Sequence, residues 1–111
     1  MEPDWCAPEA CSLDSAQQPA RVAEWDDLFA VGVRAVTPVD AGVRLDLAPA
    51  RGQAAAVADL ADREAQCCLF FRFDLAIADE TLALTIRTDP AYRSVVDALA
   101  ARALARVGSG E

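Results

Sequence analysis

The feature that most constrains the fold is the segment 64–73, EAQCCLFFRF, where the apolar pattern changes period. Before it, a helix is expected over about 53–68. Residues at three- and four-residue steps share one face of this helix, namely Val57, Leu60, Ala61, Glu64 and Cys68. After it, alternate residues from Phe71 to Ile77 are apolar, as in a strand with one buried face. The segment therefore predicts a helix that ends at two adjacent cysteines and leads directly into a strand.

The rest of the chain supplies similar patterns. A first helix begins near residue 15 and stops at Gly32, and strands are expected at 33–37 and 43–47. A second pair of strands follows at 71–77 and 82–86, and a last helix opens at Asp89-Pro90. This order predicts an α+β fold, in which a four-stranded antiparallel sheet of two hairpins carries about three helices packed on one face.

The length of 111 residues suits a single domain. Residues 1–13 lack periodicity, and we expect an irregular N-terminal arm there. The α+β metal-binding domain is expected to span 14–107, and 108–111, rich in glycine and serine, to form a frayed tail.

The charge excludes several partners. Eighteen acidic against ten basic residues give a net charge of -8, which repels nucleic acid and anionic membranes. The chain has no lysine or histidine, which excludes Schiff-base chemistry, histidine catalysis and imidazole ligands. No organic cofactor is expected.

The N-terminus does not have the pattern of a signal peptide, so we expect a cytoplasmic protein.

Glu64 is unusual because it is an acidic residue on an apolar helical face. A buried carboxylate needs a compensating partner, which an arginine, backbone donors or a metal ion can supply. One interpretation is therefore purely structural, with Glu64 paired to Arg34, Arg44 or Arg72. Similarly, Phe70, Phe71 and Phe73 are expected in the core.

The four cysteines are Cys6, Cys11, Cys67 and Cys68. Clustered cysteines in a reducing cytoplasm more often indicate metal or redox function than structural disulfides. At a helix end the sulfurs of Cys67 and Cys68 can turn to one side, and the negative end of the helix dipole favours a bound cation over a free thiolate. Cys11 is the best third thiol and Cys6 a weaker one, although buried cysteines also serve as small hydrophobes.

Thiolates prefer soft or borderline ions, here mercury, arsenite, zinc or copper(I). Three sulfurs from Cys11, Cys67 and Cys68, with the Glu64 carboxylate, would complete a tetrahedral site. A dithiol redox protein is a further alternative. We expect Cys67 and Cys68 to stay reduced in a mild glutathione buffer, because a ring closed between adjacent cysteines is strained.

Cys11-Ser12-Leu13 followed by residues 63–73 resembles a small bacterial domain with an E-x-x-C-C-x-F-x-x-F signature. That domain occurs alone or appended to MerR-like heavy-metal regulators. The resemblance implies a function in metal resistance, sensing or sequestration, with Cys11, Glu64, Cys67 and Cys68 as one functional group. It also implies a MerR-like regulator or another metal-handling protein as partner. The chain departs from the pattern at Leu69, where proline or alanine is common, and in having Cys6.

Organomercurial lyases are similar in residue types, since they use two cysteines and an acidic residue to cleave a carbon–mercury bond. Their motif spacing does not match this chain. The likeness leaves an enzymatic alternative, in which Cys67 and Cys68 hold mercury and Glu64 donates the proton to carbon.

Overall fold

The computed structural model describes residues 18–68 and 70–107. The expected arm, its Cys6 and Cys11, Leu69 and the tail lie outside these residues. The elements in chain order are α1 (Gln18–Val31), β1 (Val33–Val39), β2 (Gly42–Leu47), α2 (Gln53–Cys67), β3 (Arg72–Ala78), β4 (Thr81–Arg87), a short 3-10 turn η1 (Pro90–Tyr92) and α3 (Arg93–Leu104). In the described part of the chain, no helix is long and apolar enough to span a membrane.

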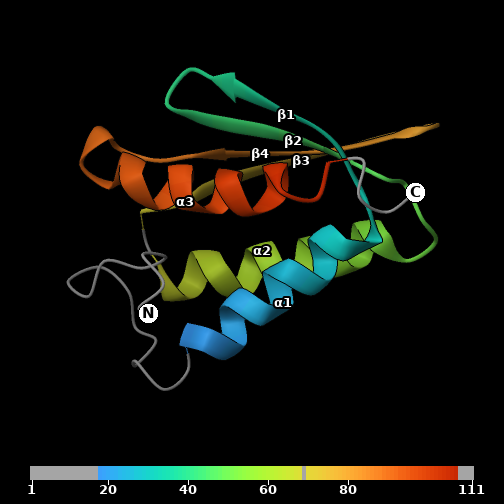
Figure 1. Ribbon diagram of the computed structural model, residues 1–111, viewed down its shortest axis with the longest axis horizontal. Helices are drawn as coiled ribbons and strands as arrows, with labels where there is room; N and C mark the ends of the chain where they lie inside the picture. The colour runs from blue at the N-terminus through green and yellow to red at the C-terminus, as the bar shows by residue number, and fades with distance from the viewer. Residues whose placement is uncertain (1–17, 69, 108–111) are drawn as a thin grey trace.

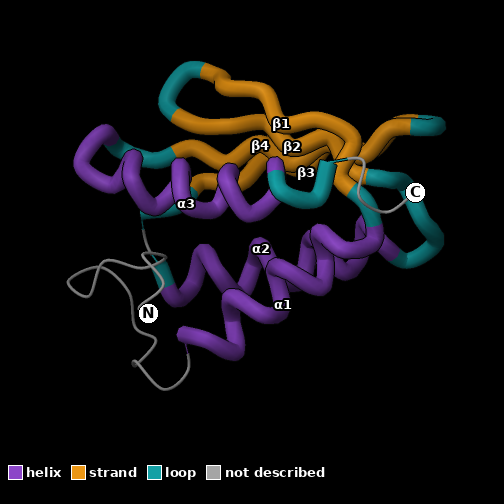
Figure 2. The backbone as a smooth tube through the Cα atoms, in the orientation of Figure 1, coloured by secondary structure: helices purple, strands orange, loops and turns teal. Residues whose placement is uncertain are grey.

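The four strands form one antiparallel sheet in the order β1-β2-β4-β3. The two hairpins meet at the central β2 and β4 strands, where Leu45 lies opposite Leu84. The helices lie on one side of this sheet (Figures 1 and 2), with α3 against β1 and β2, α2 against β3, and α1 packed on α2 and α3. The α+β prediction is confirmed.

The core lies between the sheet and the helices, and its residues follow the expected periodicities. Alternate residues of β2 and β4 point toward the helices, and all are buried: Val43, Leu45, Leu47, Leu82, Leu84 and Ile86. The predicted apolar faces of the helices are also buried, and Trp25 of α1 stacks on Phe73 with ring centroids 6.1 Å apart. Phe70 and Phe71 are core residues, as expected.

Two local details differ from the expected pattern or add to it. Asp89 forms no side-chain capping hydrogen bond, and Pro90 begins the η1 turn before α3. Gly42 is required by close packing, because a Cβ there would lie 1.8 Å from the backbone oxygen of Ile86 in the neighbouring strand. A glycine therefore allows the two central strands to approach each other at the end of the first hairpin.

Candidate functional site

The site is centred on Glu64, a residue in the last turn of α2. Glu64 is completely buried, with 0% of its surface exposed. Its Oε1 accepts a hydrogen bond from Trp25 Nε1 at 2.7 Å and lies 3.4 Å from Arg21 Nη1. Its Oε2 lies 3.2 Å from the sulfur of Cys68. Both carboxylate oxygens therefore have partners, and the charge is compensated by an arginine of α1.

That arginine is not one of those expected from the sequence. Arg34 donates to the backbone oxygen of Glu80, Arg44 pairs with Asp46, and Arg72 pairs with Asp89. All three are exposed polar contacts of strand residues, away from the α1–α2 packing that encloses Glu64. The prediction that Glu64 pairs with Arg34, Arg44 or Arg72 was wrong, because those side chains extend from strands rather than from the helix that faces α2.

Sequence reasoning missed Arg21 although a signal was present. Arg21 lies one helical turn before Trp25 and next to Val22, on the face of α1 that was expected to be buried. An arginine on an apolar face needs an anion just as Glu64 needs a cation. Arg21 and Glu64 carry opposite charges on the apolar faces of two helices, so a pairing between them could have been predicted.

Arg21 joins three groups, and its side chain is only 10% exposed. Besides Glu64, its Nη2 lies 3.8 Å from Cys67 Sγ and its Nε lies 3.5 Å from Glu24 Oε2. Burial by itself would lower the pKa of Arg21, but Glu64 and Cys67 outweigh it, so the pKa is raised. A permanent positive charge therefore lies between the buried carboxylate and the Cys67 sulfur.

The backbone at the cysteine pair changes conformation where the sequence predicted. α2 ends at Cys67, while Cys68 is extended, with φ -122° and ψ 93°, and its N–H still donates to the Glu64 carbonyl at 2.8 Å. Cys68 is buried and Cys67 is half-buried. One sulfur contacts Glu64 and the other contacts Arg21, so both lie around the same ion pair.

The two cysteines differ in redox state. Cys67 has a free thiol, whereas Cys68 forms a disulfide whose second sulfur lies outside the described residues. The two cysteines are therefore not joined to each other, but Cys68 is oxidised, which differs from the expectation that both thiols stay reduced. A disulfide sulfur has no proton, so the 3.2 Å contact to Glu64 becomes a thiol hydrogen bond only after reduction.

The expected ligand set is not assembled within residues 18–68 and 70–107. In this part of the chain no three side chains of the cysteine, histidine, aspartate or glutamate type are grouped to hold a metal ion. Glu64, Cys67 and Cys68 are brought around one ion pair, while Cys11 lies outside the described residues. Glu64 is already engaged by Trp25 and Arg21, which suits a carboxylate that positions a thiol better than one that binds metal directly.

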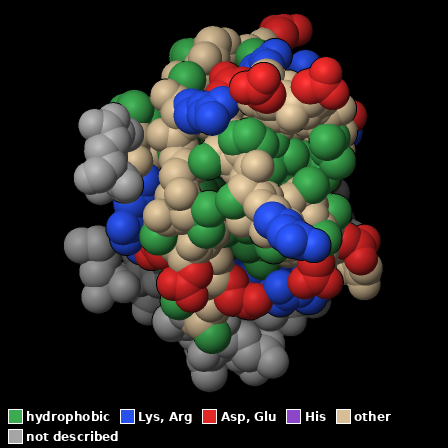
Figure 3. Space-filling model, turned by 90° about the vertical axis from the view of Figure 1, so that its right-hand side faces the viewer, with side chains coloured by type: hydrophobic (Ala, Val, Ile, Leu, Met, Phe, Trp, Pro, Cys, Tyr) green, Lys and Arg blue, Asp and Glu red, His purple; other side chains and the backbone are tan. Residues whose placement is uncertain are grey.

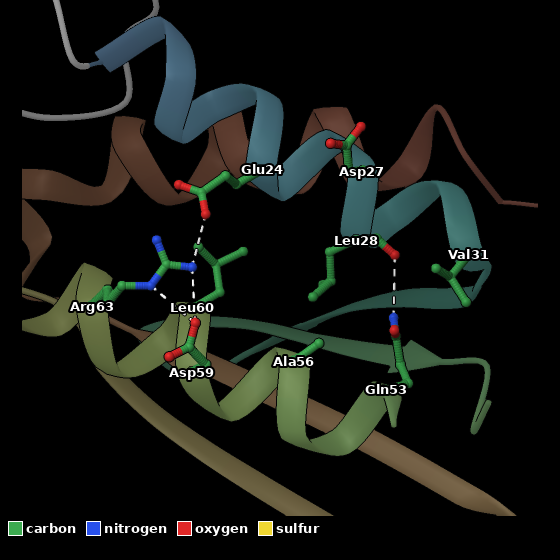
Figure 4. Close-up of a pocket in the computed structure, with 9 residues that line it drawn as sticks. All are labelled: Glu24, Asp27, Leu28, Val31, Gln53, Ala56, Asp59, Leu60 and Arg63. Atoms are coloured by element: carbon green, nitrogen blue, oxygen red, sulfur yellow. Dashed lines mark hydrogen bonds and ion pairs between the residues drawn. The ribbon is translucent and has the colours of Figure 1, made fainter. Parts of the chain in front are cut away.

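A groove on the surface between α1 and α2 lies next to the buried ion pair and is connected to it by Glu24. Figure 4 shows the Arg63 guanidinium between Glu24 and Asp59, at 2.8 and 3.0 Å. Leu28 of α1 and Leu60 of α2 also line this groove. The cavity has a volume of about 340 Å³. Glu24 thus binds Arg63 and Arg21 together and links the exposed groove to the buried cluster.

This link predicts a pH-dependent contribution from Glu24. The hydrogen bond from Arg63 is the main cause that lowers the pKa of Glu24 from its usual 4.5. A lowered folded-state pKa stabilises the fold above the unfolded-state pKa, and this contribution is lost as the pH falls through the folded-state value. Because the Glu24 side chain is 42% exposed, we expect Glu24→Gln to cost less than about 1 kcal/mol at neutral pH.

Urea unfolding of the native protein and Glu24→Gln at neutral pH and at about pH 3 measures this contribution. The difference in the free energy of unfolding should shrink at the acidic pH. A difference of equal size at both pH values would contradict the ionic origin of the effect.

Comparison with known proteins finds no matching family model, no similar curated protein and no similar solved structure.

Proposed function

We propose that this domain binds a thiophilic heavy-metal ion through clustered cysteine thiolates, in metal resistance, sensing or sequestration. The observation that supports it best is the position of the two sulfurs around a buried ion pair. Cys68 Sγ lies 3.2 Å from Glu64 Oε2, and Cys67 Sγ lies 3.8 Å from Arg21 Nη2. Core packing alone requires neither the buried charges nor the paired sulfurs.

Each described residue has a distinct role in this proposal. Glu64 accepts a hydrogen bond from the reduced Cys68 thiol and so orients its sulfur. It is a positioning residue. Arg21 balances the negative charge of a Cys67 thiolate and holds Glu64 in place. Trp25 fixes the same carboxylate by donating at 2.7 Å. Cys11 is proposed as the third sulfur ligand.

The proposed ion is mercury, arsenite, zinc or copper(I), because thiolates prefer these over hard cations. Coordination requires Cys68 in its reduced form, which a reducing cytoplasm would maintain. The proposed protein partner is a MerR-like regulator or another metal-handling protein, since this chain contains no DNA-binding motif and carries a net charge of -8.

Cysteine substitutions test the site. In protein reduced with a phosphine, Cys67→Ser and Cys68→Ser should each weaken the binding of mercury(II), arsenite or zinc by about 100-fold or more, because a hydroxyl is a poor ligand for these ions. Cys6→Ser is the matched control and should change the affinity little. Competition with a small dithiol chelator measures the affinities, and equal values for all four proteins would refute the proposal.

The disulfide of Cys68 specifically favours a second candidate, a dithiol redox function. Mass spectrometry of protein equilibrated in glutathione buffers of graded redox potential separates the two. A redox protein exchanges its disulfide within the cellular range of potentials and does not need metal. A metal-binding domain in the same buffers is protected from oxidation when zinc is added.

The 3.2 Å contact between Cys68 Sγ and Glu64 Oε2 is also compatible with the organomercurial-lyase alternative, which needs an acid next to a metal-binding sulfur. A proton donor must be able to reach the substrate carbon, but the oxygens of Glu64 are already engaged by Trp25, Arg21 and Cys68. We therefore rank binding above cleavage. Release of hydrocarbon from an organomercurial by the native protein, and its loss in Glu64→Gln, would reverse that order.

A further inference from the structure

The groove between α1 and α2 has two ends that differ in how their charges are satisfied. At one end, the Arg63 guanidinium lies between Glu24 of α1 and Asp59 of α2, at 2.8 and 3.0 Å (Figure 4). At the other end, Asp27 lines the groove, and its carboxylate has no ion pair or hydrogen bond with any residue that the structure describes. The groove therefore binds one guanidinium of its own chain and leaves a further carboxylate open to a cation.

Gln53, the first residue of α2, supplies a second acceptor at this open end. The residue is only 6% exposed, and its Nε2 donates to the backbone oxygen of Leu28 at 3.3 Å. Because a carbonyl oxygen can only accept, this hydrogen bond fixes the orientation of the side-chain amide. Gln53 lines the groove, and its Oε1 accepts no hydrogen bond within the described part of the chain. A buried side chain thus leaves an acceptor to a donor that enters the groove.

Apolar side chains lie between the two ends of the groove. Leu28, Leu60 and Ala56 line its middle, and Val31, which is 49% exposed, lines the open end (Figure 4). Figure 3 looks at the side of the molecule where α1 ends and α2 begins, and hydrophobic side chains gather there between charged ones. An aliphatic stem lying on these residues would bury apolar surface while its cationic head reaches Asp27.

The acceptors of the open end suit a guanidinium. The Asp27 carboxylate comes from α1 and the Gln53 amide oxygen from α2, just as Glu24 and Asp59 come from opposite helices around Arg63. A guanidinium has five N–H donors in a planar fork, so it can donate to acceptors on both helices at once. The bound Arg63 is therefore a model, within the same groove, for a second guanidinium.

We propose that this groove docks a protein partner through an arginine, whose guanidinium contacts Asp27 and Gln53 and whose stem lies on Ala56. Charge complementarity argues for a cationic partner. The groove is lined by three carboxylates and one guanidinium, and the chain as a whole carries a net charge of -8, which attracts a basic surface. The docking does not require a metal ion at the cysteines.

The exposure of the groove favours a protein over a small cation as its occupant. The side chains of Glu24, Arg63 and Asp59 are 42%, 40% and 67% exposed. Water and salt weaken ion pairs at such positions, so a lone small cation gains little there. A protein segment adds apolar contacts around its arginine and excludes water from the anchor.

Titration of the native protein with a short blocked peptide, in which one arginine stands next to a leucine, tests the docking. We expect changes in amide chemical shift concentrated at Asp27, Gln53 and Ala56, with a dissociation constant of about 1 mM. The same peptide with citrulline in place of arginine keeps the shape without the charge, and it should bind at least about tenfold more weakly. Equal binding of the two peptides, or no shift changes in the groove at about 5 mM peptide, overturns the proposal.

Two pairs of variants locate the contact. Asp27→Asn should weaken binding of the arginine peptide about fivefold, whereas Asp62→Asn, which removes the same charge from α2 outside the groove, should change it less than about twofold. Ala56→Arg places a guanidinium in the groove and should abolish binding. Ala55→Arg is its matched control, because Ala55 is exposed on the same helix and does not line the groove. Equal effects within either pair contradict the docking.

Other occupants of the groove would give different results. Ethylguanidinium that binds as tightly as the arginine peptide would assign the groove to a small cation. Groove shifts that change with protein concentration in the absence of peptide would assign it to a second copy of the chain. Either result overturns the docking of a protein partner.

Discussion

Arg21→Met is expected to lower the free energy of unfolding by about 3–5 kcal/mol. Methionine keeps much of the aliphatic stem and removes the guanidinium that compensates Glu64. A carboxylate that is 0% exposed would then remain in the core without this cation. Such a loss is a large fraction of the about 5–15 kcal/mol that stabilises a typical domain.

Urea unfolding under reducing conditions measures the effect, and Arg102→Met is the control. Arg102 pairs with Asp26 at the surface, where an ion pair contributes at most about 1 kcal/mol. Combining Arg21→Met with Glu64→Gln should recover part of the loss, because the buried charge is removed together with its partner. Equal costs for Arg21→Met and Arg102→Met would show that the buried pair does not stabilise the fold.

Substitution of Trp25 is expected to have an effect of similar size. Trp25→Ala should cost about 3–5 kcal/mol, because the residue is completely buried and stacks on Phe29 and Phe73. Trp25→Phe should cost about 1.5–3 kcal/mol, since it keeps a ring but removes the 2.7 Å hydrogen bond to the Glu64 carboxylate.

The same unfolding experiment with Glu64→Gln separates packing from hydrogen bonding. If the indole N–H acts through the charge of Glu64, the cost of Trp25→Phe should be smaller in the Glu64→Gln background. Phe73→Leu, which alters the ring contact without touching Glu64, should show no such dependence. Additive costs for Trp25→Phe and Glu64→Gln would contradict the proposed coupling.

The positions of the helices and strands were predictable because they depend on local periodicity. Alternation in β2 and the helical steps of Val57, Leu60 and Glu64 report which side of each element is buried, and the structure buries those sides. The same reasoning predicted that Glu64 is buried and needs a partner. It also placed the end of α2 at the two cysteines, because the period changes there.

The sequence by itself therefore determined the elements, the buried faces and the need for a counter-charge at Glu64. Only the tertiary structure decided that the counter-charge is Arg21, 43 residues earlier in the chain, that Trp25 donates to the same carboxylate, and that the strands run in the order β1-β2-β4-β3. The physical reason is that periodicity records the environment of a residue and carries no information on its partner. Which arginine meets a buried carboxylate depends on how α1 packs against α2, and that packing brings distant residues together.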